Sequence, residues 1–179
     1  MLKNTREEYG LVSRVLHWLT FLIVAGMLAG GLLLGVLPDG SIKSIVGSAH
    51  KSFGVLVFFL MAVRLLWRLA NPRPRFLGTH LVLRYVSEVL HVCLYVLLLV
   101  QPLAGILMSQ AYGYPVVVFG WIEIPTLVWH SPSLGGIFSQ IHSVTAMILA
   151  AVIIFHAAAA LKHHYIDGDR TLIRMLKYE

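Results

Sequence analysis

The chain has 179 residues, of which 58% are hydrophobic and only 12% are charged, and its mean hydropathy is +0.81. A soluble domain of this length would carry about twice that share of charged residues, so the composition excludes one and predicts an integral membrane protein. The net charge of +6 does not indicate nucleic acid binding, because the basic residues gather at the ends of apolar segments. Cys93 is the only cysteine, which excludes an internal disulfide and a cysteine-based metal site.

Four apolar segments predict an all-α bundle of four membrane-spanning helices, which together form a single domain over residues 1–179. The spans are expected at about 15–37, 42–69, 80–108 and 134–161. Each segment is long enough to cross a bilayer with some tilt, and a helix satisfies its backbone polar groups internally, as lipid requires. The first segment is too long for the apolar part of a signal peptide and lacks a clear cleavage site, which predicts a retained span.

The distribution of basic residues predicts how the bundle is oriented. Twelve of the fourteen Lys and Arg residues belong to the N-terminal tail, the region of the second connection and the C-terminal tail, whereas the other side has only Lys43 and Lys51. Both termini are therefore expected in the cytoplasm. The third connection, about residues 109–133, is rich in aromatic residues and is expected to fold back onto the outer interface, as an anchor or as a lid over a substrate.

Four histidines occupy matched depths in the predicted spans: His17 and His156 toward the cytoplasm, and His50 and His142 toward the outside. His142 and His156 are fourteen residues apart, which puts them on nearly one helix face and about 21 Å apart along the axis. Histidines in a span can simply hydrogen-bond between helices, but ionisable groups there are costly and usually functional. Two imidazoles at one depth suit the axial positions of a haem iron, whereas zinc prefers three or four clustered ligands.

Several stretches carry a resemblance to a known family: residues 13–18, 50–54, 64–68, 90–91, 156–165 and 169–175. In them, and over nearly the whole chain, the sequence resembles the bacterial cytochrome b561 family of four-helix inner-membrane proteins with two haem b groups. The resemblance implies that His17 and His156 ligate the iron of an inner haem b, and His50 and His142 that of an outer haem b. These are the pairs that the depth argument reaches independently.

The resemblance also implies electron exchange with ubiquinone. One characterised member of the family is a superoxide oxidase, while the donors of other members differ or are unclear. We therefore predict a di-haem, quinone-linked oxidoreductase that passes electrons from an unidentified periplasmic donor, with superoxide as one candidate, to ubiquinone. The alternatives are a haem-bearing anchor subunit of a larger dehydrogenase or hydrogenase complex and, less favoured, a histidine-based metal transporter.

Three further residues are candidates for contacts around these groups. Lys51 adjoins His50 on the side where cations are scarce, and is a candidate to pair with an outer haem propionate or to attract an anionic donor. His91 lies at a depth comparable to that of His17, and His163 follows His156 by two turns on the same face. Both are candidates for quinone or propionate contacts, because quinone reduction needs protons and imidazole titrates near neutral pH.

Overall fold

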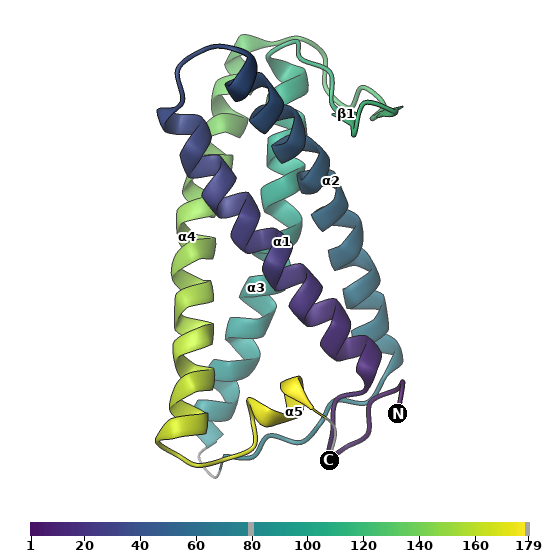
Figure 1. The fold of residues 1–179 in the computed structure, drawn as a ribbon, viewed down its shortest axis with the longest axis vertical. Coiled ribbons are helices and arrows are strands. Elements are labelled where there is room, and N and C mark those ends of the chain that lie inside the picture. The colour runs from purple at the N-terminus through teal and green to yellow at the C-terminus, as the bar shows by residue number, and fades with distance from the viewer. Residues whose placement is uncertain (79–80, 178–179) are drawn as a thin grey trace.

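The computed structural model describes residues 1–78 and 81–177. Its elements are four long helices, a short hairpin and a final helical turn: α1 (Leu11–Val36), α2 (Ser41–Ala70), α3 (Leu81–Ala111), β1 (Val117–Val118), β2 (Ile122–Glu123), α4 (Pro132–Tyr165) and α5 (Ile173–Leu176). The long helices run along one axis, and both ends of the chain lie at the same end of the bundle (Figure 1). This end is called the terminal end below, and the other the hairpin end.

All four long helices are long and apolar enough to cross a membrane, with mean hydropathies of 2.0 to 2.4 in their most apolar windows. The predicted all-α, four-helix membrane bundle is thereby confirmed. Two of the helices, α2 and α4, extend beyond their predicted apolar spans at both ends, and α1 does so at its start, because helical hydrogen bonding continues into the interface where polar residues are tolerated. The third span was expected from residue 80, which lies outside the described residues.

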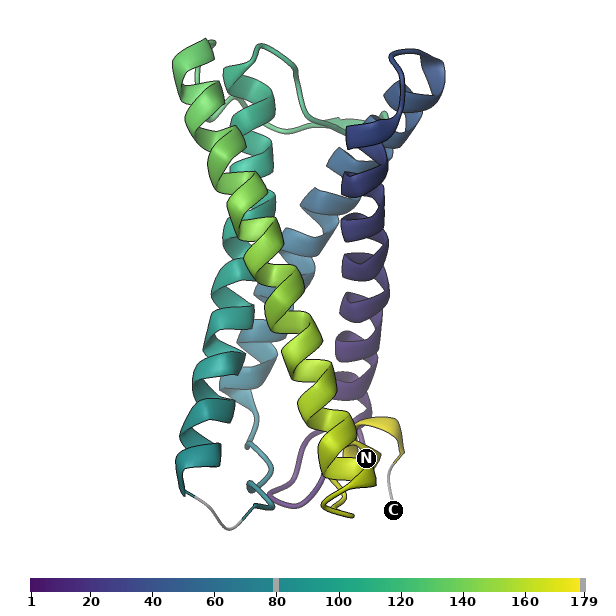
Figure 2. The ribbon, with the colours of Figure 1, turned by 90° about the vertical axis from the view of Figure 1, so that its left-hand side faces the viewer.

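The helices pack as two pairs. α3 packs along α4, α1 packs along α2, and α2 joins the pairs by packing against α3. Figure 2 shows the two pairs on opposite sides at the hairpin end, whereas toward the terminal end α4 crosses over to the side of α1. All four helices contribute to one central cluster of buried side chains, namely Val24, Val57, Met61, Leu98 and Leu149. The outward faces remain apolar and exposed, as expected for surfaces that meet lipid.

The third connection differs from a plain loop. α3 continues to Ala111, and the chain then forms a hairpin in which Val117 pairs with Glu123. Strands of two residues are too short to show alternation in the sequence, so the hairpin was not predicted. The hairpin is tied to α2 because the backbone N–H of Phe119 donates to the Ser52 hydroxyl over 2.9 Å. Trp121 remains 89% exposed at the hairpin end, which suits an aromatic side chain at a membrane interface.

Candidate functional site

The structure brings the four span histidines together in two pairs, each built across different helices. At the terminal end, the ring centroids of His17 on α1 and His156 on α4 lie 6.1 Å apart. Toward the hairpin end, those of His50 on α2 and His142 on α4 lie 6.3 Å apart. α4 thus forms a shared wall for both pairs. Counting residues along each span predicts this pairing, because a helix rises by a constant distance per residue and residue number therefore gives depth in the membrane.

The separation within each pair suits a metal ion held between two imidazoles. A metal–nitrogen bond is about 2 Å, and a further ångström or so separates the nitrogen from its ring centroid, so two such ligands place their centroids about 6 Å apart. In the part of the chain that the structure describes, no three ligand atoms lie within 4.8 Å of one another at these pairs. Among residues 1–78 and 81–177, the one group of three His, Cys, Asp or Glu ligand atoms within 4.8 Å of one another is His163, Asp167 and Asp169. The span histidines therefore fit a bis-imidazole centre better than a zinc site.

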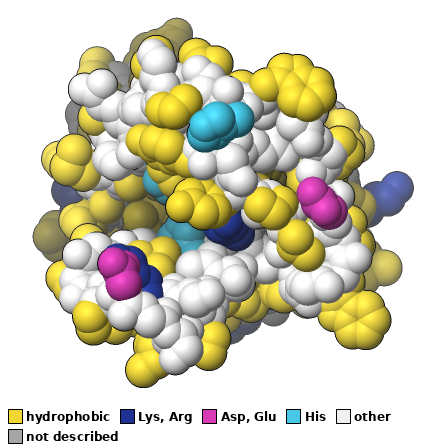
Figure 3. Space-filling view, turned by 90° about the horizontal axis from the view of Figure 1, so that it is seen from above, with side chains coloured by type: hydrophobic (Ala, Val, Ile, Leu, Met, Phe, Trp, Pro, Cys, Tyr) yellow, Lys and Arg dark blue, Asp and Glu magenta, His cyan; other side chains and the backbone are white. Residues whose placement is uncertain are grey.

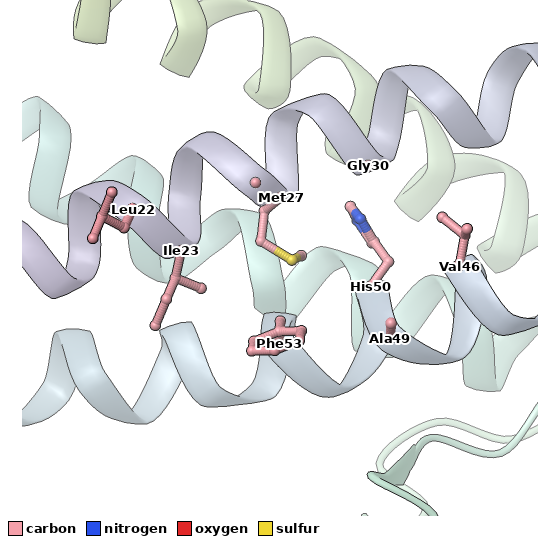
Figure 4. Close-up of a pocket in the computed structure, with 9 residues that line it drawn as sticks. Leu22, Ile23, Met27, Gly30, Val46, Ala49, His50 and Phe53 are labelled. Carbon is pink, nitrogen blue, oxygen red and sulfur yellow. The ribbon is translucent and has the colours of Figure 1, made fainter.

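The surroundings of His50 also fit a bound group. Its Nδ1 atom is buried without a hydrogen-bond partner, a costly state for a polar atom in an apolar setting. Figure 4 shows the ring pointing from α2 toward Gly30 of α1, where it lines a cavity of about 390 Å³ with Met27 and Phe53 among its apolar neighbours. A Cβ atom on Gly31 would lie 3.4 Å from His50 Cε1. Glycines at this level keep the space beside the imidazole open.

His142 is oriented by α3. Its Nδ1 lies 3.0 Å from the backbone carbonyl of Gln101 and can donate to it, which fixes the orientation of the ring and leaves Nε2 as the nitrogen with a free lone pair. The Gln101 side chain lies 3.3 Å from Nε2 and accepts a short hydrogen bond from the Thr145 hydroxyl. Gly105 admits the ring closely, since a Cβ there would lie 3.0 Å from His142 Cε1. The roles of Gln101, Thr145 and Gly105 were not predicted from the sequence. A glutamine inside an apolar span could have indicated Gln101, because polar side chains there are costly and usually functional.

A third imidazole and a guanidinium join the pair at the terminal end. The His91 ring lies 5.4 Å from that of His156, and its Nδ1 is 2.6 Å from the Ser87 carbonyl. His91 therefore lies beside the pair at the terminal end. Arg64 Nη2 lies 2.8 Å from His17 Nδ1. In the sequence, Arg64 contributes to the predicted topology and to the family resemblance, but its contact with His17 was not predicted.

His163 lies beyond this cluster and is engaged with acids. Its Nδ1 is 2.7 Å from Asp169 Oδ2 and 3.2 Å from Asp167 Oδ2. Lys162 Nζ donates to both oxygens of Asp167. The lysine ammonium therefore already neutralises the carboxylate that a metal ion would need as a ligand. Partial burial by itself would raise the pKa of the Asp169 carboxyl, but hydrogen bonds from Thr171 and His163 outweigh it and bring that pKa below its ordinary value.

Lys51 is held at the hairpin end. Its ammonium donates to the Pro115 carbonyl over 3.3 Å and lies 5.7 Å from the ring centroid of Tyr114. The third connection therefore holds the cation beside the His50 position. In the view onto this end, charged side chains are few, hydrophobic ones dominate, and histidine atoms are visible in a recess between the helices (Figure 3).

Comparison with known proteins agrees with this arrangement. Residues 8–178 match the profile of the prokaryotic cytochrome b561 family. Among curated relatives, cytochrome b561 homolog 2 of Escherichia coli is 36% identical over 176 residues, covering 97% of this chain and 93% of the relative. Cytochrome b561 homolog 1 of the same organism is 32% identical, covering 90% and 92%. The probable superoxide oxidase CybB of Yersinia pestis is 29% identical, covering 95% and 96%.

Proposed function

Since the chain belongs to the prokaryotic cytochrome b561 family, whose bacterial membrane proteins bind haem b and transfer electrons, we propose that it carries electrons from a donor at the hairpin end to a quinone at the terminal end. The observation that carries this proposal is the presence of two cross-helix imidazole pairs, with centroid separations of 6.1 and 6.3 Å. They lie about 21 Å apart along α4, most of the way across a hydrocarbon core of about 30 Å.

In this proposal each pair holds one haem b. His17 and His156 would hold the haem at the terminal end, and His50 and His142 would hold the one toward the hairpin end. A haem bound there would supply one-electron redox chemistry, and ligation by two imidazoles would favour electron transfer over oxygen binding. The Gln101 carbonyl orients His142 for this role. The apolar helix faces keep water from both positions.

The acceptor is ubiquinone, bound near His91 or His163. Reducing a quinone takes up two protons, and an imidazole can deliver them near neutral pH. His91 is supported by its position beside His156, and His163 by its contact with the carboxylate of Asp169, which orients the ring. The excess of basic residues at the terminal end supports a cytoplasmic location of both termini in the inner membrane.

The donor acts at the hairpin end, and superoxide is the candidate that the relative from Yersinia pestis suggests. Lys51 supports an anionic donor, because the Pro115 carbonyl and Tyr114 ring hold its charge near His50 at an end with few charged groups. Stopped-flow reduction of the purified protein by superoxide, with ubiquinone present, tests this step. Slow reduction that does not saturate would exclude superoxide and leave the electron-transfer function in place.

Haem counting with matched variants tests the ligand assignments. The purified protein should contain about two haems per chain, and His142→Ala should remove one of them, as should His17→Ala. His164→Ala is the control, because that ring packs edge-on against Tyr165 outside both pairs. The pyridine haemochrome assay measures the content directly. A colourless preparation with bound zinc would refute the proposal, as would two haems retained in either ligand variant.

A further inference from the structure

A second, charged cavity lies at the terminal end. It has a volume of about 270 Å³ and forms where three segments meet: the N-terminal tail, the connection before α3 and the turn of α5. Figure 1 shows these segments gathered below the long helices. One apolar residue, Leu77, lines the cavity together with six charged ones, namely Arg6, Glu7, Glu8, Arg75, Arg170 and Arg174. Neither the histidine pairs nor the proposed electron path uses it.

Contacts between distant parts of the chain build its walls. The backbone N–H of Arg75 donates to the Arg6 carbonyl over 2.8 Å, and Arg174 Nη1 donates to the Arg75 carbonyl over 3.0 Å. Trp18 on α1 fixes α5 by donating from its indole to the Met175 carbonyl over 2.9 Å. Hydrogen bonds between distant segments therefore fix the walls of the cavity.

The electrostatics of the cavity favour an anion. Four guanidinium groups face two carboxylates, which leaves a formal excess of two positive charges. Arg170 pairs with one oxygen of Glu8 over 3.2 Å. Arg174 is only 5% exposed, and its Nε is buried without a hydrogen-bond partner. A buried, unpaired guanidinium N–H is costly, and a phosphate, with several acceptor oxygens, satisfies it well.

A second orphaned atom narrows the class of ligand. Glu8 is 9% exposed, and its Oε2 is buried with no hydrogen-bond partner. A carboxylate oxygen needs a donor, which a phosphate diester by itself does not provide. A phosphoester that also carries a hydroxyl group satisfies both atoms, its phosphate toward Arg174 and its hydroxyl toward Glu8.

The cavity lies just outside the membrane-spanning helices. Its residues come shortly before α1 begins at Leu11, shortly after α2 ends at Ala70 and shortly after α4 ends at Tyr165. Phosphate groups of lipids occupy this level of a bilayer, and basic pockets at such positions bind anionic headgroups. We propose that the cavity is a binding site for a hydroxyl-bearing phosphoester, supplied by an anionic phospholipid such as phosphatidylglycerol or by a soluble glycerol phosphate.

Native mass spectrometry of the full-length haem-loaded protein tests the site, with phosphatidylglycerol and phosphatidylcholine as probes. Arg6→Gln removes an exposed wall of the cavity but keeps the backbone bond to Arg75, and Arg174→Gln removes the orphaned donor. We expect each to weaken phosphatidylglycerol binding about fivefold, as for the loss of one basic contact. The control, Arg84→Gln, changes the net charge equally at the same end, outside the cavity, and should bind normally.

Two further comparisons decide the outcome. If sn-glycerol 3-phosphate alone raises the melting temperature of the wild type but not of Arg6→Gln, the ligand is soluble. If only phosphatidylglycerol binds, the ligand is the lipid. Equal weakening in all three arginine variants, or in none, would overturn the proposal, because surface charge alone would then explain binding. The haem spectrum and size-exclusion profile show whether Arg174→Gln folds, and Arg6→Gln decides if it does not.

Discussion

Gly105→Ala should weaken the haem at the hairpin end and leave the other one unchanged. The new Cβ would lie 3.0 Å from His142 Cε1 and 3.2 Å from Nδ1, whereas ordinary contact begins at 3.4 Å. The ring must therefore move by about 0.4 Å, the difference between 3.4 and 3.0 Å. Its bond to the Gln101 carbonyl is already 3.0 Å long, and this shift takes it to the limit of a good hydrogen bond, about 3.2 Å, or beyond.

The size of the effect follows from overpacking. Extra methyl groups in packed interiors cost about 1–3 kcal/mol, and replacing glycine by alanine in a helix returns up to about 1 kcal/mol. The remaining net cost of up to about 2 kcal/mol corresponds to an up to about 30-fold faster loss of this haem if the strain falls on the ligand.

Transfer of haem to excess apomyoglobin measures the loss rate, and the second haem serves as an internal reference. Gly35→Ala is the matched control, because a Cβ there meets no atom within 4 Å. Identical transfer kinetics in Gly105→Ala and Gly35→Ala would refute the reasoning, as would an equal effect on both haems.

Three further predictions concern the terminal end. Arg64→Gln should lower the midpoint potential of the haem beside His17 by tens of millivolts in a redox titration, since a nearby cation disfavours the oxidised, more positive iron; an unchanged potential would contradict this. Trp18→Phe removes one hydrogen bond to α5, worth about 0.5–1.5 kcal/mol, and should speed hydrogen exchange in residues 172–177; unaltered exchange would count against that anchor. Because the pKa of Asp169 is lower when folded, its contribution to stability should be complete above about pH 5 and disappear as pH falls through the folded pKa, below 3.8. Asp169→Asn should flatten this acid dependence of melting, and an unchanged profile would argue against it.

The four spans and the depths of their histidines could be predicted from the sequence for one reason. A bilayer of known thickness admits only helices of sufficient apolar length, and a helix converts residue number into depth at a constant rise. His142 and His156 are therefore placed by counting, and their partners on other helices follow from the order of the spans. No such rule predicts the hairpin at residues 117–123, because its two-residue strands depend on contacts with α2.

Residue counting along the chain predicts which side chains share a level of the membrane. Which of those side chains touch depends on how the helices pack in three dimensions. Lipid is as apolar as leucine, so hydrophobicity does not set the rotation of one span against another; close packing and interhelical hydrogen bonds do. The contact of Arg64 with His17, the hold of Gln101 on His142 and the orphaned atoms of Glu8 and Arg174 all arise at that step.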